Sequence, residues 1–146
     1  MRVKLKTLPH FEGLELPSYG TPWSAGFDIR AAVDPNEPFI IQPGVTMKIP
    51  TGICLEVPFG FVGVLKGRSS SDLSGLEIPV TWVDADYRGE VFILARCTRF
   101  RYHTIERGQR IAQMKMEQVT QVTFEVVPEL SPTSRGNGGF GSTGRS

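Results

Sequence analysis

Residues 39–65, FIIQPGVTMKIPTGICLEVPFGFVGVL, contain four short runs in which hydrophobic residues alternate with other residues or follow one another directly. Proline and glycine separate the runs, and a period of two is typical of strands with one buried face. The same pattern recurs at residues 3–5, 27–31, 91–93, 111–116 and 124–126. With 16 glycines and 11 prolines between these runs, the sequence predicts an all-β sandwich, barrel or jelly roll.

The composition narrows the class of protein. The 146 residues suit one domain, and 40% of them are hydrophobic, which is enough for a buried core. The formal net charge is only +1, so the sequence has no excess of Lys and Arg of the kind that binds a nucleic-acid duplex. We therefore expect no nucleic-acid partner. No apolar run is long enough to span a membrane, and residues 1–6 alternate charge with hydrophobicity. We therefore expect a cytoplasmic protein without a membrane partner.

The cysteines and histidines give no sign of a metal site or a nucleophile. Cys54 and Cys97 lie in strand-like segments without metal-ligand spacing, and we expect two reduced thiols in the core. His10 and His103 lie far apart in the sequence and far from any nucleophile motif. They are expected on the surface or in turns.

The end of the chain, residues 135–144, combines five glycines with an arginine, an aromatic residue and two hydroxyls. Glycine allows backbone N–H groups to approach anionic oxygens closely. Arg135 can clamp a phosphate, Ser142 and Thr143 can donate hydrogen bonds to it, and Phe140 can lie on a base. The alternative is a disordered linker. The segment is not a P-loop, because no Lys-Ser/Thr pair follows the glycines.

A second cluster follows the predicted strand at 61–65. Arg68, Ser69 and Ser70 offer a cation and two hydroxyls at the start of the one helix that the sequence predicts, near Ser69–Asp72. There, hydroxyl and carboxylate side chains can cap backbone N–H groups. The cluster is either an anion cradle or a polar turn, and the sequence does not decide between them.

A third cluster, residues 83–90, contains two acids separated by one residue. Asp84 and Asp86 share a face if the segment is extended and diverge if it turns. A carboxylate beside a phosphoester can take a proton from water, and Tyr87 can pack against a sugar ring. The alternative is an Asp-rich turn that leads into the next strand.

Two further polar positions lie within predicted strands. Asp28 and Arg30 share one face of the strand at 27–31, where they can pair across the solvent face. Gln113 is a polar amide among apolar residues, which requires a hydrogen-bond partner from the backbone or from a ligand.

In their order along the chain, these clusters resemble the five motifs of the trimeric dUTPases. The motifs span residues 25–28, 67–70, 83–89, 108–113 and 135–144, and the resemblance covers about residues 4 to 144. It implies an all-β, jelly-roll-like core at residues 1–128 and a flexible arm at 129–146 that closes over a neighbouring subunit's active site. It also implies a homotrimer that cleaves dUTP to dUMP and pyrophosphate with Mg²⁺, a metal held mainly by the triphosphate and waters, with no direct protein ligand.

The resemblance also assigns roles. Asp84 is the implied general base, which orients a water for in-line attack on the α-phosphorus, and Tyr87 stacks under the deoxyribose. Asp28 and Asp86 support the site. The remaining substrate-binding residues are Arg68, Ser69, Ser70 and Gln113 for the phosphates, then Trp82, Val83 and Phe92, and finally Arg135, Phe140, Gly141, Ser142 and Thr143 in the closing arm.

One segment departs from the family's pattern. Residues 72–83 lack the asparagine of the hairpin that reads uracil, are shorter than usual, and carry Thr81 and Trp82 where a small residue is expected. Trp82 fills the hairpin's packing, occludes the base slot or stacks on a different base. The sequence therefore predicts a dUTP pyrophosphatase with a variant hairpin. The alternatives are a pyrophosphatase with altered or broadened specificity, for dCTP or a modified dUTP, and a catalytically silent regulatory trimer.

Overall fold

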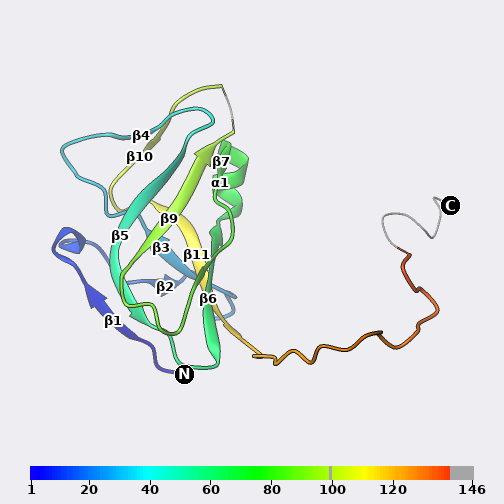
Figure 1. The fold of residues 1–146 in the computed structure, drawn as a ribbon. Helices are drawn as coiled ribbons and strands as arrows, with labels where there is room; N and C mark the ends of the chain where they lie inside the picture. The colour runs from blue at the N-terminus through cyan, green and yellow to red at the C-terminus, as the bar shows by residue number, and fades with distance from the viewer. Residues whose placement is uncertain (99, 139–146) are drawn as a thin grey trace.

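The computed structural model describes residues 1–98 and 100–138, which form eleven strands, one 3-10 turn and one short α-helix. The strands are β1 (Lys4–Thr7), β2 (Ser18–Tyr19), β3 (Phe27–Arg30), β4 (Phe39–Ile41), β5 (Thr46–Glu56), β6 (Phe61–Gly67), β7 (Leu76–Glu77), β8 (Thr81–Val83), β9 (Glu90–Cys97), β10 (His103–Ile105) and β11 (Arg110–Gln118). The turn is η1 (Pro9–Phe11) and the helix is α1 (Ser69–Ser74). The all-β class predicted from the sequence is confirmed (Figure 1).

Two antiparallel sheets enclose the core. One has the strand order β1-β5-β9-β7 and the other β2-β3-β11-β6-β8, while β10 and β4 form a separate pair. Ile49 and Ile93 of the first sheet share a buried hydrophobic cluster with Leu65 and Met114 of the second. The two larger sheets therefore face each other across one core, as in a sandwich (Figure 1).

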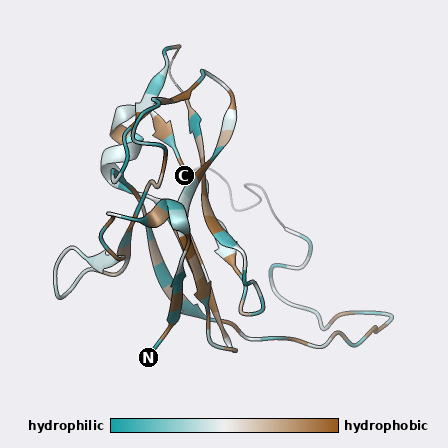
Figure 2. Cartoon of the chain, turned by 90° about the vertical axis from the view of Figure 1, so that its left-hand side faces the viewer, coloured by the Kyte–Doolittle hydropathy of each residue, from teal (hydrophilic) through white to brown (hydrophobic). Residues whose placement is uncertain are grey.

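Strand β9 shows how the sequence pattern produces this core. Val91, Ile93, Ala95 and Cys97 are buried, and the residues between them are half-buried or exposed. Figure 2 shows hydrophobic and hydrophilic residues alternating along the strands. Full burial of a large apolar side chain stabilises a fold by roughly 1.5–3 kcal/mol, so this alternation fixes which face of β9 points inward.

The two cysteines differ in burial. Cys97 lies in the core, as predicted, and its thiol donates a hydrogen bond to the carbonyl oxygen of Arg101. Cys54 is a free thiol that is only half-buried, because it lies on β5 opposite Lys6 of the edge strand β1. In the described part of the chain, no helix combines the length and apolarity that a membrane span needs. The cytoplasmic location stays a prediction.

The helix predicted near Ser69 is confirmed, but its capping is not the one expected. No side chain caps its first N–H groups. The Ser71 hydroxyl instead donates to the carbonyl oxygen of Ile111 over 2.8 Å, which ties α1 to β11. The helix ends at Gly75, whose φ of 82° lies in the left-handed region that glycine adopts without strain.

The strand predicted at residues 124–126 is wrong. The last strand ends at Gln118, and residues 119–138 form no strand. Phe124 is 91% exposed, because the chain has left both sheets and no neighbouring strand covers its apolar side chains (Figure 1). The division between core and arm at residue 128 stays a prediction.

Strand β5 unites two predicted strands, 45–49 and 53–57, across a bulge. In its ladder with β9, Pro50 pairs with Phe92 and Cys54 with Glu90, so three residues of β5 stand opposite one residue of β9. At the bulge, Gly52 has a φ of 67°, and its carbonyl oxygen accepts the Leu8 N–H over 2.8 Å. The bulge therefore bends β5 around η1 and anchors the N-terminal segment to the sheet.

We expect Gly52→Ala to destabilise the fold more than Gly44→Ala does. Both glycines have a left-handed φ, of 67° and 74°, and alanine there costs about 1–2 kcal/mol. A Cβ on Gly52 would lie 2.8 Å from the Phe11 Cβ, whereas a Cβ on Gly44 has no neighbour within 4 Å. Overpacking should cost Gly52→Ala roughly 1–3 kcal/mol more. Urea denaturation at one protein concentration measures both variants, and equal losses would contradict the packing described for the bulge.

Candidate functional site

The two acids of the third cluster lie on a turn. Strand β8 ends at the buried Val83, and the chain then reverses, with the Tyr87 N–H donating to the Asp84 carbonyl oxygen over 3.1 Å. Asp84 and Asp86 are both exposed, and neither carboxylate accepts a hydrogen bond from a described residue. Of the two arrangements that the spacing allowed, the diverging one is present. The two carboxylates therefore have different surroundings.

The tyrosine of this turn is held by its hydroxyl. Tyr87 donates to the carbonyl oxygen of Glu90 over 2.8 Å, and the absence of a side chain on Gly89 makes room for that approach, since a Cβ there would lie 2.5 Å from the Tyr87 oxygen. The Arg88 guanidinium closes the turn by donating to the carbonyl oxygens of Ala85 and Tyr87. The ring of Tyr87 is thus fixed although it is 43% exposed.

A cavity of about 230 Å³ brings the predicted catalytic and nucleoside residues together. Asp84, Tyr87, Trp82, Val83 and Phe92 all line it. They come from the edge strand β8, from the turn after it and from β9, which belongs to the opposite sheet. A carboxylate, three aromatic rings beside it and the apolar side chain of Val83 make a slot for a small, flat ligand.

Lys48 also lines this cavity, and sequence reasoning missed it. It lies on β5 opposite Leu94 of β9, and its Nζ is 5.9 Å from the centroid of the Phe92 ring. An ammonium at this distance from an aromatic face is attracted by the ring's electrons. No local signal could have found Lys48, because it reaches the cavity only through the pairing of β5 with β9.

A second cavity, of about 840 Å³, shares Trp82 and Asp84 with the first as lining residues. Its walls include Phe59, Phe61 and Val64. Trp82 is 73% exposed. Its ring therefore does not fill the packing of residues 72–83, which removes the first of the three roles considered for it.

The predicted phosphate residues gather around a buried carboxylate. Asp28 is 8% exposed, forms an ion pair with Arg68 Nε over 3.1 Å and accepts a hydrogen bond from an Arg110 terminal nitrogen over 3.2 Å. Gln113 lies directly opposite Asp28 on β11. Ser69 and Ser70 are exposed at the start of α1. The carboxylate attracts and orients two guanidinium groups, so Arg110, which sequence reasoning did not single out, belongs to this cluster.

The pairing considered for Asp28 and Arg30 is absent. The Arg30 guanidinium donates instead to Glu15 and to the carbonyl oxygen of Gly108. Asp28 instead contacts Arg68, which follows the end of β6, and Arg110, the first residue of β11. Arg30 reaches the loop that precedes β11.

The phosphate cluster and the Asp84 cavity lie at opposite ends of β6. Val83, which precedes Asp84, pairs with Gly63, and Arg68 comes just after the last residue of β6. Five residues of strand span about 16 Å. Neither cavity beside Asp84 is lined by Arg68, Ser69, Ser70 or Gln113. One chain therefore presents the two halves of the predicted site apart.

Other candidate groups lie away from these surfaces. Neither histidine lines a cavity that contains Asp84, and burial lowers the pKa of His103 below its ordinary value. Arg135 donates to the carbonyl oxygen of Gly138 over 2.9 Å, within its own loop. Phe140, Gly141, Ser142 and Thr143 lie outside the described residues. Residues 1–98 and 100–138 contain no group of three or more His, Cys, Asp or Glu side chains arranged to hold a metal ion.

Comparisons with known proteins agree with the order of the motifs. A family model described as dUTPase matches residues 12–144. The deoxyuridine 5'-triphosphate nucleotidohydrolase of Maricaulis maris (strain MCS10) is 47% identical over 146 residues, covering 97% of this chain and 95% of the relative. The enzyme of the same name from Sinorhizobium medicae (strain WSM419) is 45% identical, covering 99% of this chain and 92% of the relative.

Solved structures agree with the fold. The dUTPase of Staphylococcus bacteriophage 80alpha with dUPNHPP superposes with a TM-score of 0.83 and 25% identity, covering 99% of each chain. A mutant dUTPase of the S. aureus phage phi11, which coordinates a structural Mg(II) ion, superposes with a TM-score of 0.78. At 20% identity, over 88% of this chain and 98% of the phage chain, that second likeness concerns the fold alone.

Proposed function

The chain belongs to the dUTPase family and hydrolyses dUTP, and we propose that Asp84 is the base that activates the attacking water. The observation that carries this proposal is the cavity in which Asp84 lies beside Tyr87, Trp82, Val83 and Phe92. Asp84 is exposed and accepts no hydrogen bond from a described residue, so its lone pairs are available to a water molecule.

The proposed reaction is an in-line displacement at the α-phosphorus. Asp84 accepts a proton from water, whose oxygen forms a bond to the α-phosphorus. The bond from that phosphorus to the oxygen bridging the α- and β-phosphorus atoms breaks, and the electron pair leaves with pyrophosphate. A positioned general base of this kind typically contributes about 10²- to 10⁴-fold to the rate. The rate gain from a general base depends on its position relative to the water. The hydrogen bond from the Tyr87 N–H to the Asp84 carbonyl oxygen supports a fixed position for Asp84.

The proposed nucleoside site places the deoxyribose on Tyr87. Because the Tyr87 hydroxyl is tied to Glu90, the ring forms a fixed floor under the sugar, against which a ribose 2′-hydroxyl would clash. Strand β8 is the edge of its sheet, and its outer N–H and C=O groups are available to pair with a pyrimidine. Trp82 borders this edge, and its exposure supports contact with the base.

The proposed phosphate site consists of Arg68, Ser69, Ser70 and Gln113, with Asp28 holding Arg68 in place. The carboxylate of Asp28 offsets one of the two guanidinium charges and attracts both groups, which supports their gathering in the absence of phosphate. Magnesium, proposed as the cofactor, neutralises the triphosphate and fixes its conformation when bound. The cation prefers water and phosphate oxygens to a dedicated protein cage.

The proposed assembly is a homotrimer with composite sites. The separation of the phosphate cluster from the Asp84 cavity along β6 supports it, since a second subunit must complete each half. The apolar surface after β11 supports it as well. Val122, Phe124, Val126 and Leu130 are exposed on one chain, and such a run marks a surface that another chain covers. The arm from residue 129 onward is proposed to continue from there to a neighbouring subunit's site, with Asp86 supporting the site from the turn.

We expect Asp84→Asn to retain nucleotide binding and lose at least about 100-fold in kcat, because the amide cannot accept the water's proton. Asp86→Asn is the matched control: it removes a carboxylate from the same turn, but one that does not line the smaller cavity. It should lose far less. Pyrophosphate release and calorimetric titration with a non-hydrolysable dUTP analogue measure both quantities. A near-normal kcat for Asp84→Asn would refute its role as base.

We expect Trp82 to affect discrimination between bases. In the uracil-specific case, the wild-type enzyme hydrolyses dUTP at least about 100-fold better than dCTP, in kcat/KM. Trp82→Ala should then lower this ratio, and Trp23→Ala, which removes a still more exposed tryptophan, should leave it unchanged. Equal wild-type rates on dUTP and dCTP would establish the broadened specificity instead, and no turnover of either nucleotide would leave the silent trimer.

We expect deletion of residues 134–146 to leave a folded trimer with roughly 100-fold lower kcat, because the deletion removes the arm that excludes water from the site. Deletion of residues 145 and 146 alone is the control and should have little effect. Sedimentation equilibrium and pyrophosphate release measure the two properties. A monomer or an unfolded chain after the longer deletion would show that this segment belongs to the core.

A further inference from the structure

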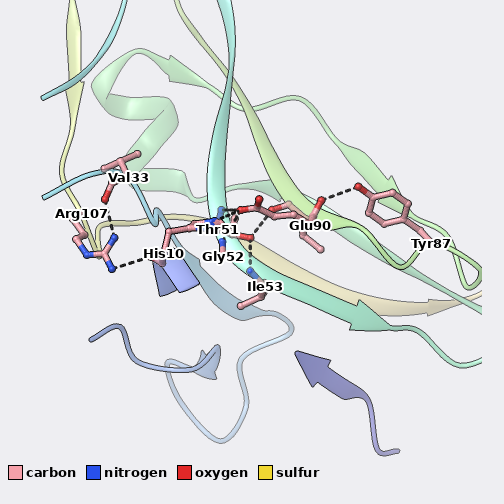
Figure 3. Close-up of polar contacts among 9 residues, drawn as sticks. His10, Val33, Thr51, Gly52, Ile53, Tyr87, Glu90 and Arg107 are labelled. Carbon is pink, nitrogen blue, oxygen red and sulfur yellow. Dashed lines mark hydrogen bonds and ion pairs between the residues drawn. The ribbon is translucent and has the colours of Figure 1, made fainter. Parts of the chain in front are cut away.

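The carboxylate of Glu90 closes the bulge of β5. One oxygen, Oε1, accepts the N–H groups of Thr51 over 3.0 Å and Gly52 over 2.8 Å, and lies 2.8 Å from His10 Nε2 (Figure 3). The Glu90 side chain is 13% exposed. At the bulge, β5 has no ladder partner for these N–H groups, because Thr51 to Ile53 stand opposite Val91 alone. A buried N–H without a partner is costly, so Glu90 supplies what the ladder cannot.

The main chain of Glu90 faces the substrate cavity. Its carbonyl oxygen accepts the Tyr87 hydroxyl over 2.8 Å, on the side of the residue away from the bulge (Figure 3). Tyr87 is 43% exposed, so packing alone does not fix its ring. The position of the ring therefore follows the position of the Glu90 backbone, which the carboxylate anchors to β5.

Further hydrogen bonds fix His10 and Thr51, two of the partners of Glu90. The Arg107 guanidinium donates to the carbonyl oxygens of Val33, His10 and Glu12, over 2.8, 2.9 and 2.7 Å. This fixes η1, and with it the imidazole that meets Glu90 (Figure 3). Thr51 is buried and its hydroxyl donates to the carbonyl oxygen of Val91, the residue after Glu90. The start of β9 is thus fastened from both sides.

We propose that Glu90 is a positioning residue for sugar selection: by closing the β5 bulge, it sets the place of the Tyr87 ring against the deoxyribose. The inference rests on the role of Tyr87 in the proposed function and extends it to a residue that touches no substrate. Selection against ribose then depends on a contact with the N-terminal segment, through His10, on the far side of β5.

The test is the ratio of kcat/KM for dUTP to that for UTP, measured in full-length variants well below their unfolding temperatures. Glu90→Ala should lower this ratio about tenfold, because the bulge loses its acceptor and Tyr87 shifts. Glu90→Gln retains an oxygen at the same place and should restore most of the ratio. Tyr87→Phe removes the hydroxyl and should lower the ratio to a similar extent.

The double variant Tyr87→Phe with Glu90→Ala separates positioning from general stability. If Glu90 acts through the Tyr87 hydroxyl, the double variant loses no more selectivity than either single variant. The effects of two substitutions that break the same interaction do not add. Additive losses would overturn the proposal. So would a Glu90→Ala variant with a lowered Tm and an unchanged ratio, because that result is the one expected of a merely structural residue.

The variant Tyr87→Ala distinguishes two outcomes: that Glu90 does not position Tyr87, or that Tyr87 does not select the sugar. A wild-type ratio in Tyr87→Ala would show that the ring does not select the sugar, which overturns both. A large loss in Tyr87→Ala together with a wild-type ratio in Glu90→Ala would overturn the role of Glu90 and leave the sugar site in place.

Discussion

The bulge of β5 is the constraint on which the rest of this fold depends. A strand that gains residues in mid-ladder leaves N–H groups without partners, and in a buried place they must be satisfied. Glu90 does so from the opposite strand. Around this point, the Gly52 carbonyl oxygen accepts the Leu8 N–H, and the Pro50 carbonyl oxygen accepts the Ala32 N–H. The N-terminal segment, the chain leaving β3 and the start of β9 therefore all take their positions from one irregularity.

The sequence predicted the regular parts of the fold well, because period-two burial is a local signal. Strand β9 and helix α1 are present where the pattern placed them. The bulge was not predictable from the sequence. Without the register of β5 against β9, Gly52 cannot be distinguished from a glycine in a turn between two strands. The apolar run around Phe124 led to a wrong strand prediction. It has the composition of a strand, but composition cannot say whether the partner strand belongs to the same chain.

The site was predictable to the extent that its residues are close in sequence. Asp84 and Tyr87 share one turn, so their proximity needed no knowledge of the fold. Arg110 and Lys48 reach their clusters only across strands, one beside Asp28 and the other above Phe92. Charged residues on strand surfaces are common, and nothing local separates these two from the rest. Long-range pairing converts an ordinary surface cation into part of a site.

Strand β8 is three residues long, forms the edge of its sheet and pairs with β6 alone. Val83 of β8 is buried, while Trp82 is exposed and lines the same cavity as the Asp84 carboxylate. A substitution at residue 82 therefore changes a wall of the cavity beside Asp84 without opening a hole in the core. If the base lies at this edge, as proposed, its preferred identity can change with little loss of stability, because Asp84 keeps its place on the turn that follows.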